Sequence, residues 1–295
     1  MMYHLSRKIF PKRKTMKTIR LSHAVEGFLL TCKARKLSKN TYIDYERTLK
    51  KFQAHVGNPD VNAITSGQVS AFLASQPFSA KTILNYHIGL SAFWTWMIRE
   101  EFTEKHVPRV VERPKPQKIS IQPFSETEIR AMLQAVSGKR GELRYRAVIY
   151  LLLDTGLRAS ELCGLQREDI DLANQRVRVM GKGNKERHIP FSQRTASAIF
   201  RYLTEVGGRP FGMTRSALTH HLTKIGERAG VPDVHAHRFR HTFSIMYLRN
   251  GGDPYTLQEI LGHSTMDMVR RYLHIAQVDI ERAHRKASPV ENMKL

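Results

Sequence analysis

The apolar residues of the first hundred positions recur at the three- and four-residue steps of amphipathic helices, and they predict four helices between Thr18 and Glu104. Ser38 is placed to cap the second helix, Gly57 follows its last apolar residue, and Ser79 is placed to begin the fourth. The aromatic side chains of the fourth helix fall on one stripe, which we interpret as packed core. This block is therefore predicted to form a small helical domain.

The second block, from about Phe124 to Lys286, mixes helical and strand patterns. A capping box at Ser125–Glu128 begins a helix, and an apolar helix is predicted over Arg146–Thr155. Residues alternate over Arg176–Met180 as in a strand, and a Gly-Lys-Gly-Asn turn leads to a return strand at Arg187–Pro190. Most of the remainder is helical. The predicted fold class is mainly α with a small antiparallel sheet (α+β).

Between the blocks the periodic pattern stops, and four prolines among basic residues predict an extended, charged linker. Five segments are predicted: a basic N-terminal extension at 1–16, a helical domain at 17–107, the linker at 108–123, a second domain at 124–286 and a C-terminal tail at 287–295. The extension lacks the apolar stretch of a signal peptide and is interpreted as a basic arm.

Charge indicates what kind of partner this chain binds. Lys and Arg number 48 against 26 Asp and Glu, so the formal net charge of the 295 residues is +22. This surplus favours a polyanion, either nucleic acid or an anionic membrane. No run of 18 apolar residues is present, which argues against a membrane span, and the positive charge is spread over both blocks and the linker, as a clamp around DNA requires. The two cysteines suggest no disulfide framework, so a reducing cytoplasm is expected.

Arg158 follows Gly156 at the end of the predicted apolar helix, and Glu161 stands one helical turn later. A carboxylate at this spacing holds a guanidinium ready for bidentate contact with phosphate, although the spacing also suits an ordinary ion pair on a helix surface. Lys182 stands at the tip of the predicted hairpin, where a lysine either reaches into a groove or is simply solvated. Two basic residues beside it are assigned to DNA contact: Lys185 and Arg187.

His237 and Arg240 are three apart in the first turn of a helix predicted over Ala236–Arg249, so both project from one face near backbone N–H groups that favour an anion. Histidine exchanges a proton near neutral pH, whereas arginine stays charged. A metal site at His235, His237 and His241 is an alternative, but few carboxylates and no cysteine stand nearby to complete its shell.

His263 and Tyr272 flank the start of a further predicted helix. A tyrosine with its ordinary pKa of about 10 is a poor nucleophile at neutral pH unless cations stabilise the phenolate. By itself Tyr272 is better explained as a packed aromatic beside Met268 and Ile275. In company with two arginines, a lysine and the histidines, it is predicted to attack a clamped phosphate, which indicates the breaking and rejoining of DNA.

These residues occur in the order and local contexts of the tyrosine recombinase (lambda integrase) family, and the chain most resembles its compact Xer-type members. The most specific pieces are Thr-Gly-Leu-Arg-Ala-Ser-Glu-Leu at 155–162, Gly-Lys-Gly-Asn-Lys-Glu-Arg at 181–187, His-Arg-Phe-Arg-His at 237–241 and Leu-Gly-His-Ser at 261–264, with Tyr272 nine residues past the last histidine. The resemblance implies an N-terminal four-helix core-binding domain of the SAM-like type and a C-terminal tyrosine recombinase catalytic domain.

The resemblance also implies the active-site residues: Arg158, Lys182, His237, Arg240, His263 and Tyr272, with Glu161 in support. Tyr272 would be the nucleophile that forms a 3′-phosphotyrosine link and frees a 5′-hydroxyl. Lys182 would protonate the leaving 5′-oxygen, and His237 would assist proton transfer at the tyrosine.

In the same resemblance, Arg158 and Arg240 would hold the non-bridging oxygens of the phosphate. His263 would add a hydrogen bond to it, and Glu161 would brace the site. No metal, ATP or other cofactor is required, because the covalent link conserves the energy of the ester. These implied roles agree with the chemistry expected from the residues themselves: a charge clamp, an acid, a base and a nucleophile.

For the first block, the resemblance places Lys39, Thr41 and Tyr42 at the DNA backbone. The implied partner is double-stranded DNA with paired recognition sites, bound by a homo-tetramer or by a hetero-tetramer with a second recombinase. No membrane partner is expected, and the implied location is the cytoplasm, on the nucleoid.

Three other functions remain to be weighed against recombination. If one of the arginines or the tyrosine were missing, a catalytically silent DNA-binding or architectural protein of the same fold would be favoured. All of these residues are present. A metal-dependent nuclease needs a cluster of carboxylates. Asp169 and Asp171 are the best candidates for such a cluster, and they are poor ones. A relaxing topoisomerase uses the same chemistry and differs in assembly and site preference.

Overall fold

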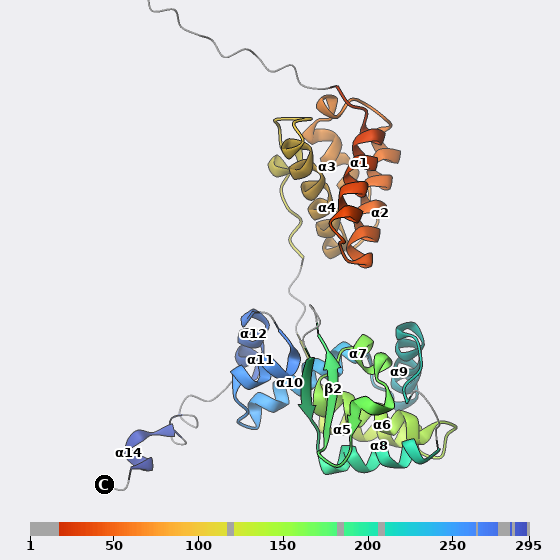
Figure 1. Cartoon of the computed structure of the whole chain (residues 1–295), viewed down its shortest axis with the longest axis vertical. Coiled ribbons are helices and arrows are strands. Elements are labelled where there is room, and N and C mark those ends of the chain that lie inside the picture. Colours follow the sequence, from red (N-terminus) through yellow and green to blue (C-terminus); the bar gives the residue numbers. More distant parts are fainter. Residues whose placement is uncertain are drawn as a thin grey trace, which may run out of the picture. The chain divides into compact units, whose positions relative to one another are not determined.

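The computed structural model of the chain divides into two compact units, Met1–Ile119 and Ser120–Leu295 (Figure 1). The structure describes residues 18–116, 121–181, 186–205, 210–263, 265–276, 284 and 287–293. The division between the units falls inside the segment 108–123, for which the sequence predicts a linker.

The N-terminal unit contains the helices that the apolar spacing predicts. Its elements are α1 (Leu21–Ala34), α2 (Lys39–Val56), η1 (Val61–Ala63), α3 (Ser66–Ala74), α4 (Ala80–Arg99) and η2 (Val107–Val110), where η denotes a 3₁₀ helix. Both predicted caps are present, because the side chain of Ser38 accepts a hydrogen bond from the backbone N–H of Thr41 and that of Ser79 from Thr82. Gly57 ends α2 at a φ of 75°.

The aromatic stripe of α4 is core, as predicted. Phe93 and Trp94 are fully buried. The ring of Trp94 meets that of Phe52 of α2 edge-on at 5.8 Å between centroids, and Phe52 meets Phe72 of α3 at 5.3 Å. Edge-to-face packing of this kind adds to the burial of the rings and holds the helices around one core.

The first part of the predicted linker packs on the N-terminal unit. Pro108 is buried, and the Nε2 of His87 on α4 lies 3.0 Å from the carbonyl oxygen of Pro108 and 3.2 Å from that of Val111. A single turn of 3₁₀ helix is too short to produce a periodic pattern, so its packing was not visible in the sequence.

The C-terminal unit is mainly helical, with a small antiparallel sheet, as the sequence predicts (Figure 1). Its helices within the described residues are α5 (Glu126–Val136), α6 (Glu142–Thr155), α7 (Ala159–Gly164), η3 (Arg167–Asp169), α8 (Gln193–Glu205), α9 (Arg215–Ala229), α10 (Ala236–Arg249), α11 (Pro254–Leu261), α12 (Asp267–Ala276) and α14 (Pro289–Asn292). Its strands are β1 (Ile170–Asp171), β2 (Arg176–Met180) and β3 (Glu186–Pro190), paired in that order.

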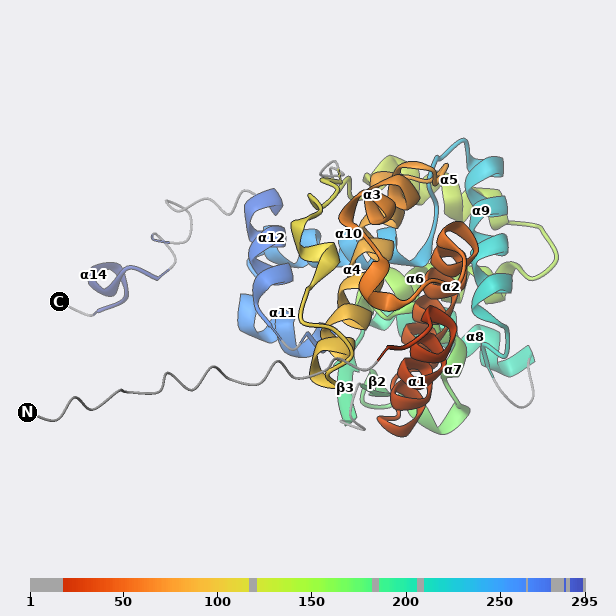
Figure 2. The ribbon, with the colours of Figure 1, turned by 90° about the horizontal axis from the view of Figure 1, so that it is seen from above.

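Helix α6 lies in the core of this unit, where Ala147–Ile149, Leu151 and Leu152 are fully buried. It packs against α8 and α10, and α10 packs in turn against α12. Figures 1 and 2 both place α11 and α12 at one end of the unit and α9 at the other. The predicted hairpin is present, with Val177 opposite Ile189 and Met180 opposite Glu186.

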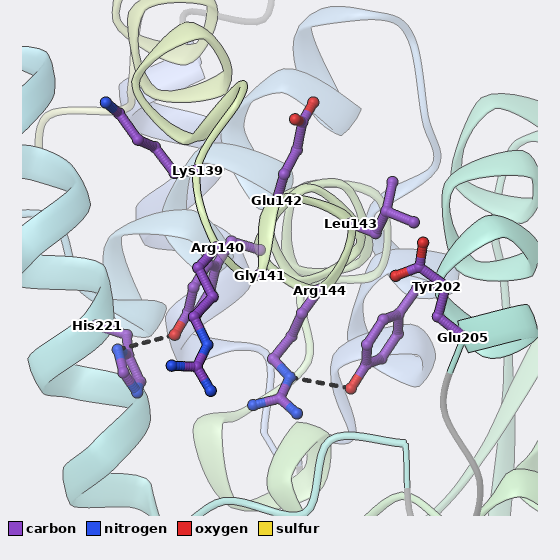
Figure 3. A pocket seen from close by; sticks show the side chains of 10 residues that line it. Lys139, Arg140, Gly141, Glu142, Leu143, Arg144, Tyr202, Glu205 and His221 are labelled. Carbon is purple, nitrogen blue, oxygen red and sulfur yellow. Dashed lines mark hydrogen bonds between the residues drawn. The ribbon is translucent and has the colours of Figure 1, made fainter.

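Two hydrogen bonds tie the start of α6 to α8 and α9, beside a hollow of about 670 Å³ (Figure 3). The Nε of Arg144 donates to the hydroxyl of Tyr202 on α8 at 3.0 Å, and the hydroxyl of Tyr145 lies 2.9 Å from Nδ1 of His221 on α9. These contacts set where α9 lies relative to α6, the helix that leads to Arg158.

Over the residues that the structure describes, no helix combines the length and the apolar character needed to cross a bilayer.

Candidate active site

A cavity of about 520 Å³ lies among the ends of α7, α10 and α12. Five of the site residues predicted from the sequence line it: Arg158, His237, Arg240, His263 and Tyr272. They come from four places in the chain separated by up to 114 residues, so the fold brings together what the sequence shows only as separate motifs.

Arg158 caps α7, and the i, i+3 pairing with Glu161 is present. Its backbone N–H donates to Oε2 of Glu161 at 2.8 Å, and its Nη1 donates to Oε1 at 2.9 Å. The Arg158 side chain remains 40% exposed, whereas that of Glu161 is 8% exposed. The carboxylate therefore anchors one edge of the guanidinium, and Nη2 also donates to the carbonyl of Gly262 at 3.3 Å. The exposed part of the side chain remains accessible to an anion.

Glu161 is shared by a second arginine that lies far from it in sequence. Arg187 of β3 donates through Nη2 to Oε1 of Glu161 at 3.0 Å and through Nε to the carbonyl of Ile260 at 2.9 Å. Burial acts to raise the pKa of Glu161, but the hydrogen bond from Arg158 and the charge of Arg187 outweigh burial and lower it. The Arg187 side chain is only 13% exposed, so the structure turns its charge toward Glu161 and not outward.

Gly156 supplies the turn that presents Arg158. Its φ is +61°, a left-handed conformation that side chains disfavour, and an added Cβ would lie 2.5 Å from Cδ1 of Phe243 and 3.0 Å from Cδ2 of Leu261. The close approach of α10 and α11 to this backbone is what places Arg240 beside Arg158.

Replacing Gly156 by Ala is expected to destabilise the C-terminal unit. The left-handed backbone costs about 1–2 kcal/mol for a residue with a Cβ, and the overlap with Phe243 adds about 1–3 kcal/mol. Urea unfolding of the full chain checks this, with Gly164→Ala as the matched control, since a Cβ there meets nothing within 4 Å. Equal midpoints for the two variants would contradict the close packing.

Arg240 is the most enclosed charge of the site, at 2% exposure. Its Nη1 donates to the carbonyl of Gly156 at 2.8 Å, and its Nη2 donates to that of Leu261 at 2.7 Å and lies 2.8 Å from Nε2 of His263. Burial, together with the charge of Arg158, lowers its pKa to about 10, which still leaves it cationic at neutral pH. The two carbonyls hold the guanidinium in place before any phosphate arrives.

His263 is neutral and oriented by Arg240. Burial and the nearby Arg240, Arg158 and Arg187 lower its pKa to about 4. Because Nε2 faces the donating Arg240, the proton of the neutral ring lies on Nδ1, a buried atom that no described residue satisfies. An N–H without a partner at a cavity lined by two arginines is suited to a phosphate oxygen.

Tyr272 is fully buried on α12, packed with Val269 and Leu261 in the core between α10, α11 and α12. Its hydroxyl nevertheless reaches a polar partner, since it lies 2.8 Å from Nδ1 of His241 on α10. Burial raises the pKa of Tyr272, and Arg240 partly offsets this effect. The tyrosine is therefore both the packed aromatic that its spacing suggests and a lining residue of the cavity.

His241 is a site residue whose position the motifs alone do not explain. Its ring lies 4.2 Å from that of His237, centroid to centroid, and the two residues are four apart on α10. That spacing was the available signal, because it places both histidines on one helix face. Burial and the adjacent His237 lower the pKa of His241 to about 4, and burial and Arg240 also lower that of His237.

The alternative metal site at the histidines does not form in the described part of the chain. His235 is the N-cap of α10, where its Nδ1 accepts from the backbone N–H of Arg238 at 3.2 Å. Among the residues described, no group of three or more His, Cys, Asp or Glu side chains is placed to hold a metal ion.

The remaining predicted residues are placed as follows. Lys182 and Lys185 lie outside the described residues. Lys39, Thr41 and Tyr42 lie in the first turn of α2 in the N-terminal unit, with Lys39 exposed and the ring of Tyr42 5.3 Å from Nζ of Lys33.

Comparison with protein families identifies both units. Residues 122–278 match the model of the phage integrase family, and residues 25–101 match that of the phage integrase N-terminal SAM-like domain. The first match covers more than half of the chain. The chain belongs to the phage integrase family. The resemblance inferred from the motifs is thereby confirmed.

Individual relatives extend this family match over most of the chain. It is 32% identical to the tyrosine recombinase XerC of Staphylococcus carnosus, over 90% of this chain and 96% of the relative, and 30% identical to XerC of Listeria innocua, over 86% and 93%. Among solved structures, the Tn1549 transposon integrase in complex with transposon right-end DNA has a TM-score of 0.75 at 21% identity, over 91% of this chain and 99% of that one. A lambda integrase dimer bound to a core site has a TM-score of 0.75 at 16% identity, over 87% and 77%.

These family members share the fold with this chain, which confirms the predicted fold class of an N-terminal SAM-like domain and a C-terminal catalytic domain.

Proposed function

We propose that this chain is a tyrosine site-specific recombinase, which cleaves and rejoins DNA strands through a 3′-phosphotyrosine intermediate at Tyr272. The observation that carries the proposal is the cavity in which the Tyr272 side chain meets Arg158, Arg240 and His263. An enclosed site with two cations, a free imidazole N–H and a phenol matches the needs of phosphoryl transfer to a tyrosine.

Arg158 and Arg240 bind the non-bridging oxygens of the scissile phosphate. Each is already held by protein acceptors, Glu161 for one and two carbonyls for the other, so little reorganisation accompanies binding. The Nδ1–H of His263 donates a third hydrogen bond. Together they balance the charge that grows on the phosphorane as the tyrosine attacks.

The leaving group and the supporting contacts complete the assignment. Lys182 protonates the 5′-oxygen as it leaves, a role that rests on the family motif. His237 assists proton transfer beside the nucleophile, and Glu161 with Arg187 braces Arg158.

Contacts to the DNA backbone away from the cleaved phosphate come from both units. In the N-terminal unit they are made by Lys39, Thr41 and Tyr42, and in the C-terminal unit Lys185 adds one. The net charge of +22 supports this proposal, since backbone contacts are mainly electrostatic.

For the assembly, we propose four protomers on two recognition sites, either identical or shared with a second recombinase, acting on the nucleoid in the cytoplasm. A lambda integrase tetramer has been solved on a Holliday junction, and it resembles this chain with a TM-score of 0.73 at 16% identity, over 85% of this chain and 79% of that one. The two biological roles that fit are resolution of chromosome dimers and integration or excision of a mobile element.

The test uses duplex DNA nicked near candidate sites, incubated with the protein in EDTA and run on a denaturing gel. Candidate sites come from repeats flanking the gene and from the chromosomal dimer-resolution locus. A slow band that carries labelled DNA and is sensitive to protease establishes metal-free covalent cleavage. Tight, specific binding without this band, even after a second recombinase is added, favours the catalytically silent DNA-binding protein instead.

DNA affinity is expected to fall steeply with salt. A protein that contacts 6–10 phosphates loses about 10³–10⁵ in affinity between about 50 and 200 mM salt, because neutralised phosphates release their counterions. Fluorescence anisotropy of labelled duplex across this range measures the slope. A flat response contradicts a clamp that relies on charge distributed over both units.

A further inference from the structure

The hydroxyl of Tyr272 has a histidine partner that is not one of the six residues to which the family resemblance assigns catalytic roles. A hydrogen bond with the side chain of Ser244 also acts to lower the pKa of Tyr272, against the effect of burial. Nδ1 of His241 lies 2.8 Å from the Tyr272 hydroxyl, and the two rings are 5.6 Å apart at an interplanar angle of 63°. The contact joins α10 to α12, two helices that pack against each other. It is therefore part of the packed structure and does not depend on an exposed side chain.

We propose that His241 is a catalytic residue, which takes the proton of the Tyr272 hydroxyl during strand cleavage and returns it during rejoining. This proposal rests on the proposed function, because it assigns the proton of the nucleophile in that reaction.

The surroundings of His241 keep its ring neutral, which is the state that a base requires. The charged and titratable groups around it are His235, His237 and Arg240 on its own helix and Arg271 and Tyr272 on α12. None of these is a carboxylate, and with burial as the largest cause they lower its pKa to about 4. At neutral pH Nδ1 can accept from the phenol, with the ring proton on Nε2.

Strand cleavage transfers one proton from Tyr272 to His241 and one from the acid to the leaving oxygen. The O–H bond of Tyr272 breaks and its proton moves to Nδ1 of His241, while the oxygen uses the freed electron pair to bond to phosphorus. The bond from phosphorus to the 5′-oxygen breaks, and that oxygen takes a proton from the acid assigned to Lys182. In rejoining, the 5′-hydroxyl returns its proton to the group assigned to Lys182 and attacks phosphorus. The bond from phosphorus to the Tyr272 oxygen breaks, and the imidazolium of His241 protonates the departing phenolate.

The low basicity of His241 determines when the proton moves. Burial raises the pKa of the Tyr272 phenol and lowers that of the His241 imidazole to about 4, so complete proton transfer before the attack is unfavourable. Once the phenol oxygen bonds to phosphorus it loses its basicity, so the transfer becomes favourable during the attack. The phosphate charge between Arg158 and Arg240 also weakens their repulsion of the imidazolium.

His237, which is assigned above to assist proton transfer, lies beside this contact without making it. In the present proposal it supports His241, which itself takes up the proton. Its ring faces that of His241 at 4.2 Å, and it lines the cavity near Arg158 and Arg240. Of the two histidines, His241 therefore contacts the hydroxyl of the nucleophile, whereas His237 lines the cavity with the two arginines that bind the phosphate.

The experiment measures single-turnover cleavage of the nicked duplex from pH 6 to 9.5 by the full chain and by His241→Asn, at saturating protein. Asn keeps a hydrogen-bonding group near the position of Nδ1 but cannot take up a proton. We expect a loss of about 10² at pH 7, the lower end of the contribution of a general base. The loss should shrink by about tenfold per pH unit above that, as hydroxide replaces the base. His274→Asn, an exposed histidine on α12, is the matched control and should cleave like the unmodified chain.

A constant deficit across the pH range overturns the proposal, because it indicates that His241 only positions Tyr272. Cleavage by His241→Asn at the unmodified rate overturns it as well. If the unmodified chain forms no adduct, the proposed function fails first, and that outcome is distinct from either result.

A second measurement guards against a variant that simply folds poorly. In a Tyr272→Phe background, a strand ending in a 3′-nitrophenyl phosphate is joined to a 5′-hydroxyl strand, and the nitrophenolate leaves without needing a proton. Adding His241→Asn should leave this rate unchanged. A similar loss in this reaction means that the substitution damages the whole site, and it overturns the assignment of the proton to His241.

Discussion

Replacing Tyr272 by Phe is expected to abolish the covalent protein–DNA adduct while DNA affinity stays within about threefold, less than 1 kcal/mol of binding free energy. The phenyl ring still fills the core among α10, α11 and α12, and the side chain is 0% exposed, so the surface that meets DNA is unchanged. Loss of the hydrogen bond to His241 lowers the free energy of unfolding by only about 0.5–1.5 kcal/mol. The denaturing gel measures the adduct, and anisotropy measures the affinity.

Tyr255→Phe is the matched control, since this tyrosine is 70% exposed on α11. It should form the adduct at the unmodified rate. An adduct that survives in Tyr272→Phe places the nucleophile at another residue and removes the central step of the proposed mechanism.

Local signals were sufficient for most elements of this fold. Helix α10 spans Ala236–Arg249, as predicted, and Gly251 and Gly252 follow its end. Its N-cap is His235, whose side chain accepts from the backbone N–H of Arg238. The capping box of Ser125 and Glu128 is present in both directions. The 3₁₀ turn at Val107–Val110 was missed, since one turn of helix has no period and its burial depends on the distant His87.

The site was predictable only where its contacts are local or belong to a known motif. The pair Arg158 and Glu161 follows from a three-residue spacing. The inward orientation of Arg187 does not, because its partner Glu161 lies 26 residues away and the pairing depends on how β3 packs on α7 and α11. For His241, the sequence shows the helix face but not that α12 brings a phenol to it.

The near-complete burial of Arg240 leads to the second large effect. Arg240→Lys is expected to reduce the single-turnover cleavage rate by about 10²–10³, the usual cost of removing one prearranged charge donor. An ammonium group carries the same charge but lacks the planar fork, so it cannot serve the carbonyls of Gly156 and Leu261 and a phosphate oxygen together. A carbonyl left without a donor should also lower the free energy of unfolding by about 1–3 kcal/mol.

Two comparisons separate geometry from charge in this result. Arg249→Lys, at an exposed position on the same helix, should leave both the cleavage rate and the unfolding midpoint unchanged. Because Arg240→Lys retains the net charge, the salt dependence of its DNA binding should match that of the unmodified chain. Cleavage at the normal rate by Arg240→Lys would show that charge alone suffices at this position, and that the hydrogen bonds of the guanidinium to Gly156 and Leu261 support the fold without contributing to catalysis.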